Sequence, residues 1–128
     1  MLKEELKTLR EFINVFIKRG WIQESMSLAR APIMFIPKKN RKKRLVVNYR
    51  RLNNITIKDR YIVPLVDEIR EQLRKAKWFT LIDLQDKYYY LCIKEGDKWK
   101  IAFRTRYRHY EFTIMPIGLT NVVASFQR

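Results

Sequence analysis

The first regular pattern along the chain is an apolar stripe at three- and four-residue spacing near the amino terminus. This spacing predicts one buried face of an amphipathic helix over residues 2–18, ending near Gly20. Residues 21–30 have no strong periodicity, so we expect an irregular connection there. The stripe consists of Leu2, Leu6, Leu9, Ile13 and Phe16.

Two short apolar runs follow, and each predicts a strand. The first is APIMFIP over residues 31–37, and the second is RLVVNY over residues 44–49. The basic run KKNRKKR lies between them and becomes the tip of a β-hairpin. A polar connection containing Asn53 and Asn54 comes next.

A second helix is predicted over residues 64–76. Pro64 suits its first position, and Leu65, Ile69 and Leu73 supply a stripe that we expect to be buried. Strand-like runs then cover residues 78–84, 88–94, 99–104 and 110–115, with a turn at 95–97, and a last helix starts near Asn121. Helices and mainly antiparallel strands in irregular order indicate an α+β fold.

Charge changes this picture most. Lys and Arg number 28 against 13 acidic residues, which gives a formal charge of +15. Such an imbalance repels itself in the folded state and favours a polyanionic partner, for which nucleic acid fits best. Acidic membrane surfaces fit less well, because no basic amphipathic helix carries most of the charge. A basic protein without any such partner is the alternative.

The remaining composition narrows the class of protein. No apolar stretch is long enough to span a membrane, and the amino terminus does not resemble a signal peptide, so we expect an intracellular protein, cytoplasmic or nuclear. The single cysteine, Cys92, cannot form an internal disulfide, and we expect it to be a small buried apolar residue. His109 has no second histidine or cysteine partner with which to bind a metal.

Four segments, in this order and spacing, carry a resemblance to a known family. Together they resemble the reverse transcriptases of gypsy-type long-terminal-repeat retrotransposons, over nearly the whole chain. They are APIMFIPKKNRKKRLVVNYRRLN (31–53), ITIKDRYIVPLVDEI (55–69), WFTLIDLQDKYYYLCIKEGDKWKIAFRTRYRHYEF (78–112) and MPIGLTNVVASFQ (115–127).

The resemblance implies a right-hand polymerase truncated within its palm. Residues 1–57 would be the first part of the fingers with the leading helix, 58–91 a palm-like part, 92–121 the second part of the fingers, and 122–128 the start of a palm helix. Such enzymes copy RNA or DNA into DNA with two magnesium ions held by three aspartates.

Individual roles follow from matching positions. Asp83 corresponds to the first catalytic, metal-binding aspartate, beside the backbone carbonyl of Leu84. Tyr88 corresponds to the aromatic residue beneath the incoming sugar, although a tyrosine of the core is the alternative. Ile117 lies in the loop that packs against the nascent base pair.

The basic residues are matched in the same way. Lys38 and Arg44 correspond to fingers residues that grip the triphosphate, and Lys39, Arg41, Lys42 and Lys43 beside them would contact nucleic acid. A solvated charged turn and a nuclear-localisation signal are alternatives for this run. Arg104 and Arg106, interleaved with Trp99, Arg108 and Tyr110, would lie near the template.

The sequence also departs from the family. It has no Asp-Asp pair, so the magnesium site is incomplete and the chain alone should not polymerise. Lys87 replaces a small residue beside the nucleotide pocket, which argues against deoxynucleotide binding. Other departures from the family pattern are Asn40-Arg41, Asn48, Ile117 and Val122-Val123.

Two functions follow from this sequence. The first is a segment of an RNA-directed DNA polymerase that binds a DNA or RNA template-primer. The alternative is a reused, noncatalytic module that binds nucleic acid or protein. In either case an unpaired edge of a truncated palm sheet would favour self-association into a homo-oligomer.

Overall fold

In the computed structural model, which describes residues 2–128, the leading stripe forms the predicted helix α1 (Lys3–Lys18). Leu9 and Ile13 on this stripe are buried. Gly20 has a φ of 70°, a left-handed conformation that glycine adopts without steric cost and that ends the helix. The predicted amphipathic helix is confirmed.

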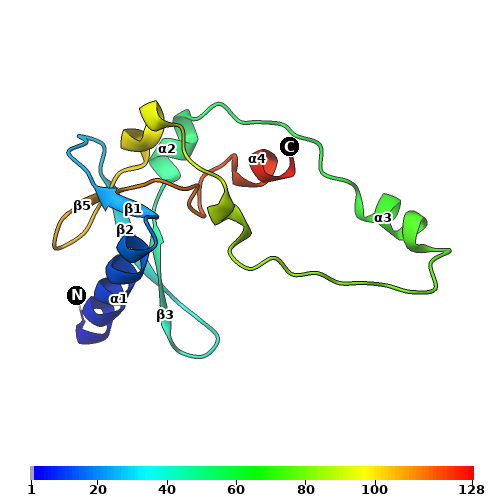
Figure 1. The fold of residues 1–128 in the computed structure, drawn as a ribbon, viewed down its shortest axis with the longest axis horizontal. Coiled ribbons are helices and arrows are strands. Elements are labelled where there is room, and N and C mark those ends of the chain that lie inside the picture. Colours follow the sequence, from blue (N-terminus) through cyan, green and yellow to red (C-terminus); the bar gives the residue numbers. More distant parts are fainter. Residues whose placement is uncertain (1) are drawn as a thin grey trace.

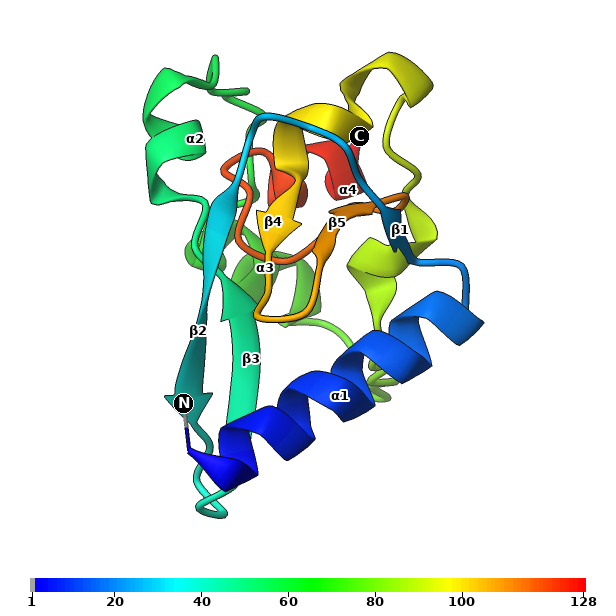
Figure 2. The same ribbon diagram turned by 90° about the vertical axis from the view of Figure 1, so that its left-hand side faces the viewer.

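One five-stranded sheet lies beside α1, with the strand order β1-β5-β4-β2-β3 (Figures 1 and 2). All neighbouring strands are antiparallel except β2 and β4. The α+β fold with a mainly antiparallel sheet is therefore confirmed. The strands are β1 (Ile22–Glu24), β2 (Ala31–Pro37), β3 (Lys43–Val47), β4 (Phe103–Arg104) and β5 (His109–Phe112).

Strands β2 and β3 form the predicted basic hairpin. Their pairing extends to Pro37 opposite Lys43, and the Lys38 N–H donates to the Lys42 carbonyl at 2.7 Å across the turn. Arg41 takes a positive φ of 62° within this turn. The hairpin points away from the rest of the sheet, toward the amino-terminal end of α1 (Figure 2).

The core lies between α1 and the sheet. Leu9 and Ile13 of α1 belong to the same buried cluster as Val47, Phe103 and Phe112 of the strands. The Phe103 and Phe112 rings lie 5.0 Å apart between centroids. Burial of these large apolar side chains is the main contribution that stabilises the packing of α1 on the sheet.

Two connections are more ordered than the sequence predicted. Residues 21–30 contain β1, whose Ile22 is buried and pairs with Phe112; a three-residue strand is too short for a pattern to reveal. The polar connection after β3 is the short helix α2 (Arg50–Ile55). Asn53 of this helix forms hydrogen bonds with the loop at Gly118 and Thr120. The polar residues of this segment are therefore compatible with a helical backbone.

Helix α3 (Val66–Leu73) is confirmed, but its apolar stripe is not buried. Leu65 is 67% exposed, Ile69 43% and Leu73 46%. Figure 1 shows the reason: α3 lies on an extended arm, far from the sheet. Helical periodicity indicates an apolar face, but not what lies opposite it.

The strands predicted between residues 78 and 104 are mostly wrong. Residues 78–84 have no regular structure, and η1 (Lys87–Tyr90) and η2 (Glu95–Ile101) are 3₁₀ helices. Only Phe103–Arg104 is a strand, and Cys92 makes one isolated antiparallel bridge with Ile114. Short apolar runs do not by themselves distinguish strands from other conformations.

The carboxy-terminal part of the pattern is confirmed in outline. Strand β5 covers part of the predicted residues 110–115, and helix α4 (Val122–Gln127) starts directly after Asn121. Cys92 is exposed, so the expectation of a buried thiol is wrong. Among residues 2–128, no helix is both long and apolar enough to cross a bilayer.

Candidate nucleic-acid interface

The tip of the β2–β3 hairpin is a cluster of exposed cations. The exposed residues Lys38, Lys39, Arg41 and Lys42 follow one another around the hydrogen-bonded turn. Lys43 differs: its ammonium group contacts Glu5 of α1 at 2.6 Å, and its side chain is partly buried. The other four cations make no ion pair within residues 2–128 and can reach a phosphate.

Arg44 and Ile117, two of the expected nucleotide-binding residues, line one small cavity of about 120 Å³. Asp86 and Tyr89 lie in the same wall. Burial raises the pKa of Tyr89 above its usual value; the negative Asp86 raises it further and the positive Arg44 opposes them. Tyr89 stands in a run of three tyrosines, and no local pattern distinguished it from its neighbours.

Tyr88 lies next to this cavity wall, on η1. Its ring meets the Phe126 ring of α4 edge-on, with centroids 5.6 Å apart. The Lys87 ammonium lies 4.9 Å from the Tyr88 centroid and 5.4 Å from that of Phe126. Residues 87–90 form a 3₁₀ helix and not the start of the strand predicted over residues 88–94.

Asp83 and Leu84 are both exposed and lie on the irregular return of the arm, not at the end of a strand. Asp86, three residues on, has a left-handed φ of 52°. Within residues 2–128, no group of three or more His, Cys, Asp or Glu side chains could hold a metal ion. The residues of this chain therefore do not fit a magnesium centre without further ligands.

A cavity of about 580 Å³ is strongly basic. It lies between the start of β2, helix α2 and strand β4, and none of its lining residues is acidic. Its four arginines make no ion pair within the described residues 2–128, whereas its lysine, Lys100, contacts Asp97 at 2.7 Å. These arginines are Arg30, Arg50, Arg51 and Arg104.

Apolar and aromatic groups form another part of this arginine-lined cavity. Tyr49 is only 2% exposed, and its hydroxyl donates to the Ile101 carbonyl at 2.7 Å. Pro32, Leu52 and Ile55 also line the cavity. Cations beside apolar surface suit a ligand that has both phosphate and base.

A neighbouring cavity of about 350 Å³ shares Leu52 and Lys100 with the arginine-lined cavity. Asn53 lines it and fixes the neighbouring loop: its amide donates to the Gly118 carbonyl at 2.7 Å and accepts from the Thr120 N–H at 2.9 Å. Helix α2 thus anchors the loop that carries Ile117. The sequence pattern predicted only that Asn53 lies in a polar connection.

The expected template-facing residues separate into two groups. Arg104 lines the arginine-lined cavity and Trp99 is half exposed, whereas Arg106 lies exposed in the β4–β5 turn and does not line it. Tyr110 is buried, so it cannot stack on a base, and Arg108 contacts Glu24 at 2.6 Å. Sequence reasoning missed Arg30, Arg50 and Arg51, although the adjacent arginines at 50 and 51 were a visible signal.

Comparison with known proteins identifies the family. Residues 36–128 match the family described as "Reverse transcriptase (RNA-dependent DNA polymerase)". The chain belongs to this family. Reverse transcriptases generally use divalent metal ions such as magnesium, and these residues form part of such a polymerase domain.

The similar proteins are retrotransposon polyproteins. The chain is 41% identical over 121 residues to the "Retrovirus-related Pol polyprotein from transposon 297" of Drosophila melanogaster, covering 91% of this chain and 11% of that protein. It is 32% identical over 123 residues to the "Transposon Tf2-3 polyprotein" of Schizosaccharomyces pombe, covering 96% of this chain and 9% of the relative. The chain thus spans about a tenth of the length of these polyproteins.

Solved structures share the fold. The foamy viral protease-reverse transcriptase in complex with dsDNA superposes with a TM-score of 0.80 at 23% identity, over 99% of this chain and 24% of that one. The same protein in complex with an RNA/DNA hybrid gives a TM-score of 0.81 at 20% identity, over 99% and 17%. Together the matches favour a reverse-transcriptase segment over a reused interaction module.

Proposed function

We propose that this chain supplies the nucleic-acid-binding part of an RNA-directed DNA polymerase, and that a template strand binds in the arginine-lined cavity. The observation that carries this proposal is the set of four arginines without ion-pair partners among residues 2–128, around a cavity without acidic residues. Repulsion between these positive charges destabilises the folded chain, and binding of a phosphate backbone would neutralise them. The foamy viral relatives are described in complex with dsDNA and an RNA/DNA hybrid, which supports this class of partner.

The hairpin tip and the small cavity would serve the incoming nucleotide. Lys38 and Arg44 would contact its triphosphate, and Tyr88 and Ile117 would border its sugar and base. Lys39, Arg41 and Lys42 would add charge for the nucleic-acid backbone. Residues 1–57 and 92–121 would then act as fingers, with 58–91 and 122–128 contributing to the palm.

Magnesium would need ligands from outside these residues. Asp83 and the Leu84 carbonyl offer hard oxygen donors of the kind that magnesium prefers. One carboxylate cannot hold two ions, so polymerisation would require further carboxylates.

Two further aspects of the function are also proposals. We propose an intracellular place of action, in the cytoplasm or the nucleus, and the basic turn could serve as a localisation signal as well as a phosphate contact. Self-association through an outer strand of the sheet, β1 or β3, is likewise a proposal, and sedimentation at rising concentration tests it.

Binding of a fluorescent single-stranded oligonucleotide at several salt concentrations tests the template proposal. Arg50→Ala with Arg51→Ala should weaken binding and reduce the magnitude of the salt slope by about 1.4, since each neutralised phosphate contributes about 0.7 for single strands. Lys7→Ala with Lys18→Ala is the matched control, because it removes the same charge from the exposed face of α1. Equal losses in both double variants would contradict a site in the cavity.

A further inference from the structure

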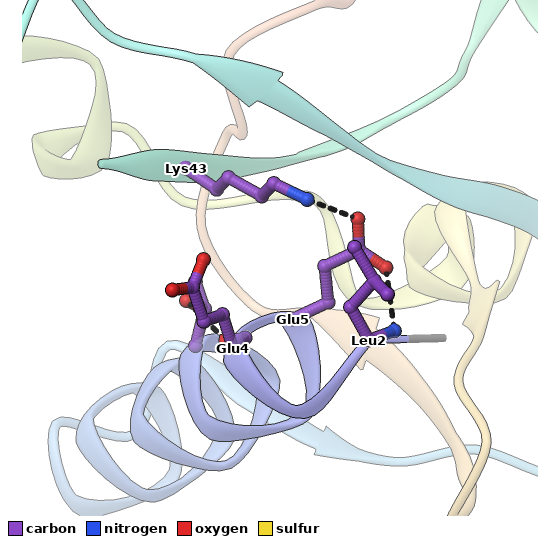
Figure 3. Close-up of polar contacts among 5 residues, drawn as sticks. Leu2, Glu4, Glu5 and Lys43 are labelled. Carbon is purple, nitrogen blue, oxygen red and sulfur yellow. Dashed lines mark hydrogen bonds and ion pairs between the residues drawn. The ribbon is translucent and has the colours of Figure 1, made fainter. Parts of the chain in front are cut away.

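A single carboxylate joins the first turn of α1 to the basic hairpin. Figure 3 shows Glu5 between two partners: its Oε1 lies 2.6 Å from the Lys43 Nζ, and its Oε2 accepts the Leu2 backbone N–H at 3.2 Å. The Glu5 and Lys43 side chains are only 20% and 26% exposed. Within residues 2–128, this ion pair is the only one that connects the hairpin to another element.

The charge of Glu5 is maintained by these same contacts. The hydrogen bond from Lys43 and then the one from the Leu2 N–H lower the pKa of the Glu5 carboxyl below its usual value. The carboxylate is therefore ionised at neutral pH. It also lies in the first turn of α1, where the helix dipole favours a negative charge.

The position of the contact along the hairpin matters most. Lys43 pairs with Pro37, the last pair of the β2–β3 ladder before the basic turn. A two-stranded hairpin is only marginally stable by itself, so a contact at this point restricts the direction of everything beyond it. Arg44 is the next residue of β3, and alternation along the strand directs it to the opposite face from Lys43.

We propose that Glu5 is a positioning residue for the hairpin: by holding Lys43 against α1, it fixes the direction of residues 38–44 and leaves Lys38 and Arg44 to bind phosphate. Lys43 then serves as an anchor and not as a phosphate contact. This inference rests on the proposed role of the hairpin in binding a triphosphate.

Distances between two spin labels test the positioning directly. The labels are placed by Asn40→Cys at the turn and Lys18→Cys at the far end of α1, with Cys92→Ser removing the native thiol. Glu5→Gln and Lys43→Met should each broaden the distance distribution, and Glu5→Lys combined with Lys43→Glu should narrow it again. Glu4→Gln is the matched control, because no contact joins the Glu4 side chain to Lys43 (Figure 3). An unchanged width in Glu5→Gln would overturn the proposal.

Binding of inorganic triphosphate distinguishes a positioning role of Glu5 from a purely electrostatic one, because the two predict opposite changes in affinity. Removing a negative charge beside a basic turn should by simple electrostatics strengthen anion binding. If Glu5 positions the hairpin, Glu5→Gln should instead weaken binding about three- to fivefold, the equivalent of losing about one partly exposed ion pair. Equal or tighter binding would overturn the proposal. If the unaltered chain bound no triphosphate, the proposed function of the hairpin would fail, and the label widths would decide the positioning separately.

Discussion

Tyr49 shows how one side chain serves both the core and the candidate interface. It is almost fully buried in the same cluster as Phe103, and it is also one of the residues that line the arginine-lined cavity. Its hydroxyl satisfies the Ile101 carbonyl at the end of η2. One hydrogen bond therefore links helix α2, which begins at Arg50, to the segment that leads into β4.

Tyr49→Phe should destabilise the chain by about 1–2 kcal/mol, because the buried Ile101 carbonyl loses its donor. Unfolding in urea, followed by circular dichroism, measures this difference. Tyr107→Phe is the matched control: its exposed hydroxyl accepts a hydrogen bond from Arg10 at 2.9 Å, and its loss should cost less than about 0.5 kcal/mol. Equal costs would show that the Tyr49 hydrogen bond is not buried from water.

The same residue should make stability depend on alkaline pH. Burial raises the pKa of the Tyr49 phenol in the folded chain, whereas the unfolded value is about 10. Above about pH 10 the unfolded state releases a proton that the folded state keeps, so the free energy of unfolding falls as pH rises. Tyr49→Phe should therefore lose less stability between about pH 9 and pH 11 than the unaltered chain. Parallel losses, measured by urea unfolding at each pH, would contradict this.

Among the site residues, the sequence predicted chemistry better than geometry. Lys38, Lys39, Arg41 and Lys42 were expected at a turn, and the local pattern was sufficient to place them there. The arginine-lined cavity joins side chains from three separate segments, and no local pattern reveals such a meeting. Metal binding by Asp83 stays a prediction. Residues 78–84 have no regular structure, so no strand positions the Asp83 carboxylate.

At the scale of elements, α1 and α3 have the same kind of pattern but different surroundings. Each carries an apolar stripe with acidic residues in its first turn. Leu9 and Ile13 of the α1 stripe are buried against the sheet, whereas the α3 stripe is exposed on the arm. Sequence periodicity predicted both helices correctly, and only the tertiary arrangement distinguishes them.

A pair of truncations measures this difference between the two helices. Leu9→Ala in α1 should cost about 2–5 kcal/mol, because Leu9 is fully buried and its removal leaves a cavity. Ile69→Ala in α3 should change stability by less than about 0.5 kcal/mol, because Ile69 is exposed outside the core and alanine favours a helix. A cost above about 2 kcal/mol for Ile69→Ala would mean that its stripe is covered in solution.

The strands show the same dependence on surroundings. The β2–β3 hairpin was predictable, because its two runs are neighbours in sequence and pair with each other. The apolar run over residues 78–84 has the composition of a strand but no strand beside it among residues 2–128. Strand composition fits a half-buried pleated surface, and without a neighbouring strand it does not produce one.

At the scale of the molecule, the chain consists of a packed body and one arm. The arm leaves the body after α2, carries α3, and returns before η1 (Figure 1). Its apolar side chains are exposed, with Trp78 at 92% and Leu81 at 97%. In the body, strands from before and after the arm belong to one sheet, because β1 pairs with β5 and β2 pairs with β4.

This arrangement predicts how chymotrypsin should cut the chain. The first cleavages should follow exposed residues of the arm, such as Trp78 and Phe79, because Trp78 is 92% exposed. The aromatic residues of the sheet are instead buried, and they are Phe103, Tyr110 and Phe112. The two fragments should then remain together at native size, since the sheet and its core hold strands from both. Mass spectrometry locates the cuts, and size-exclusion chromatography measures the association. Early cleavage after the buried Phe103, Tyr110 or Phe112, or separation of the fragments, would contradict a body that is stable independently of the arm.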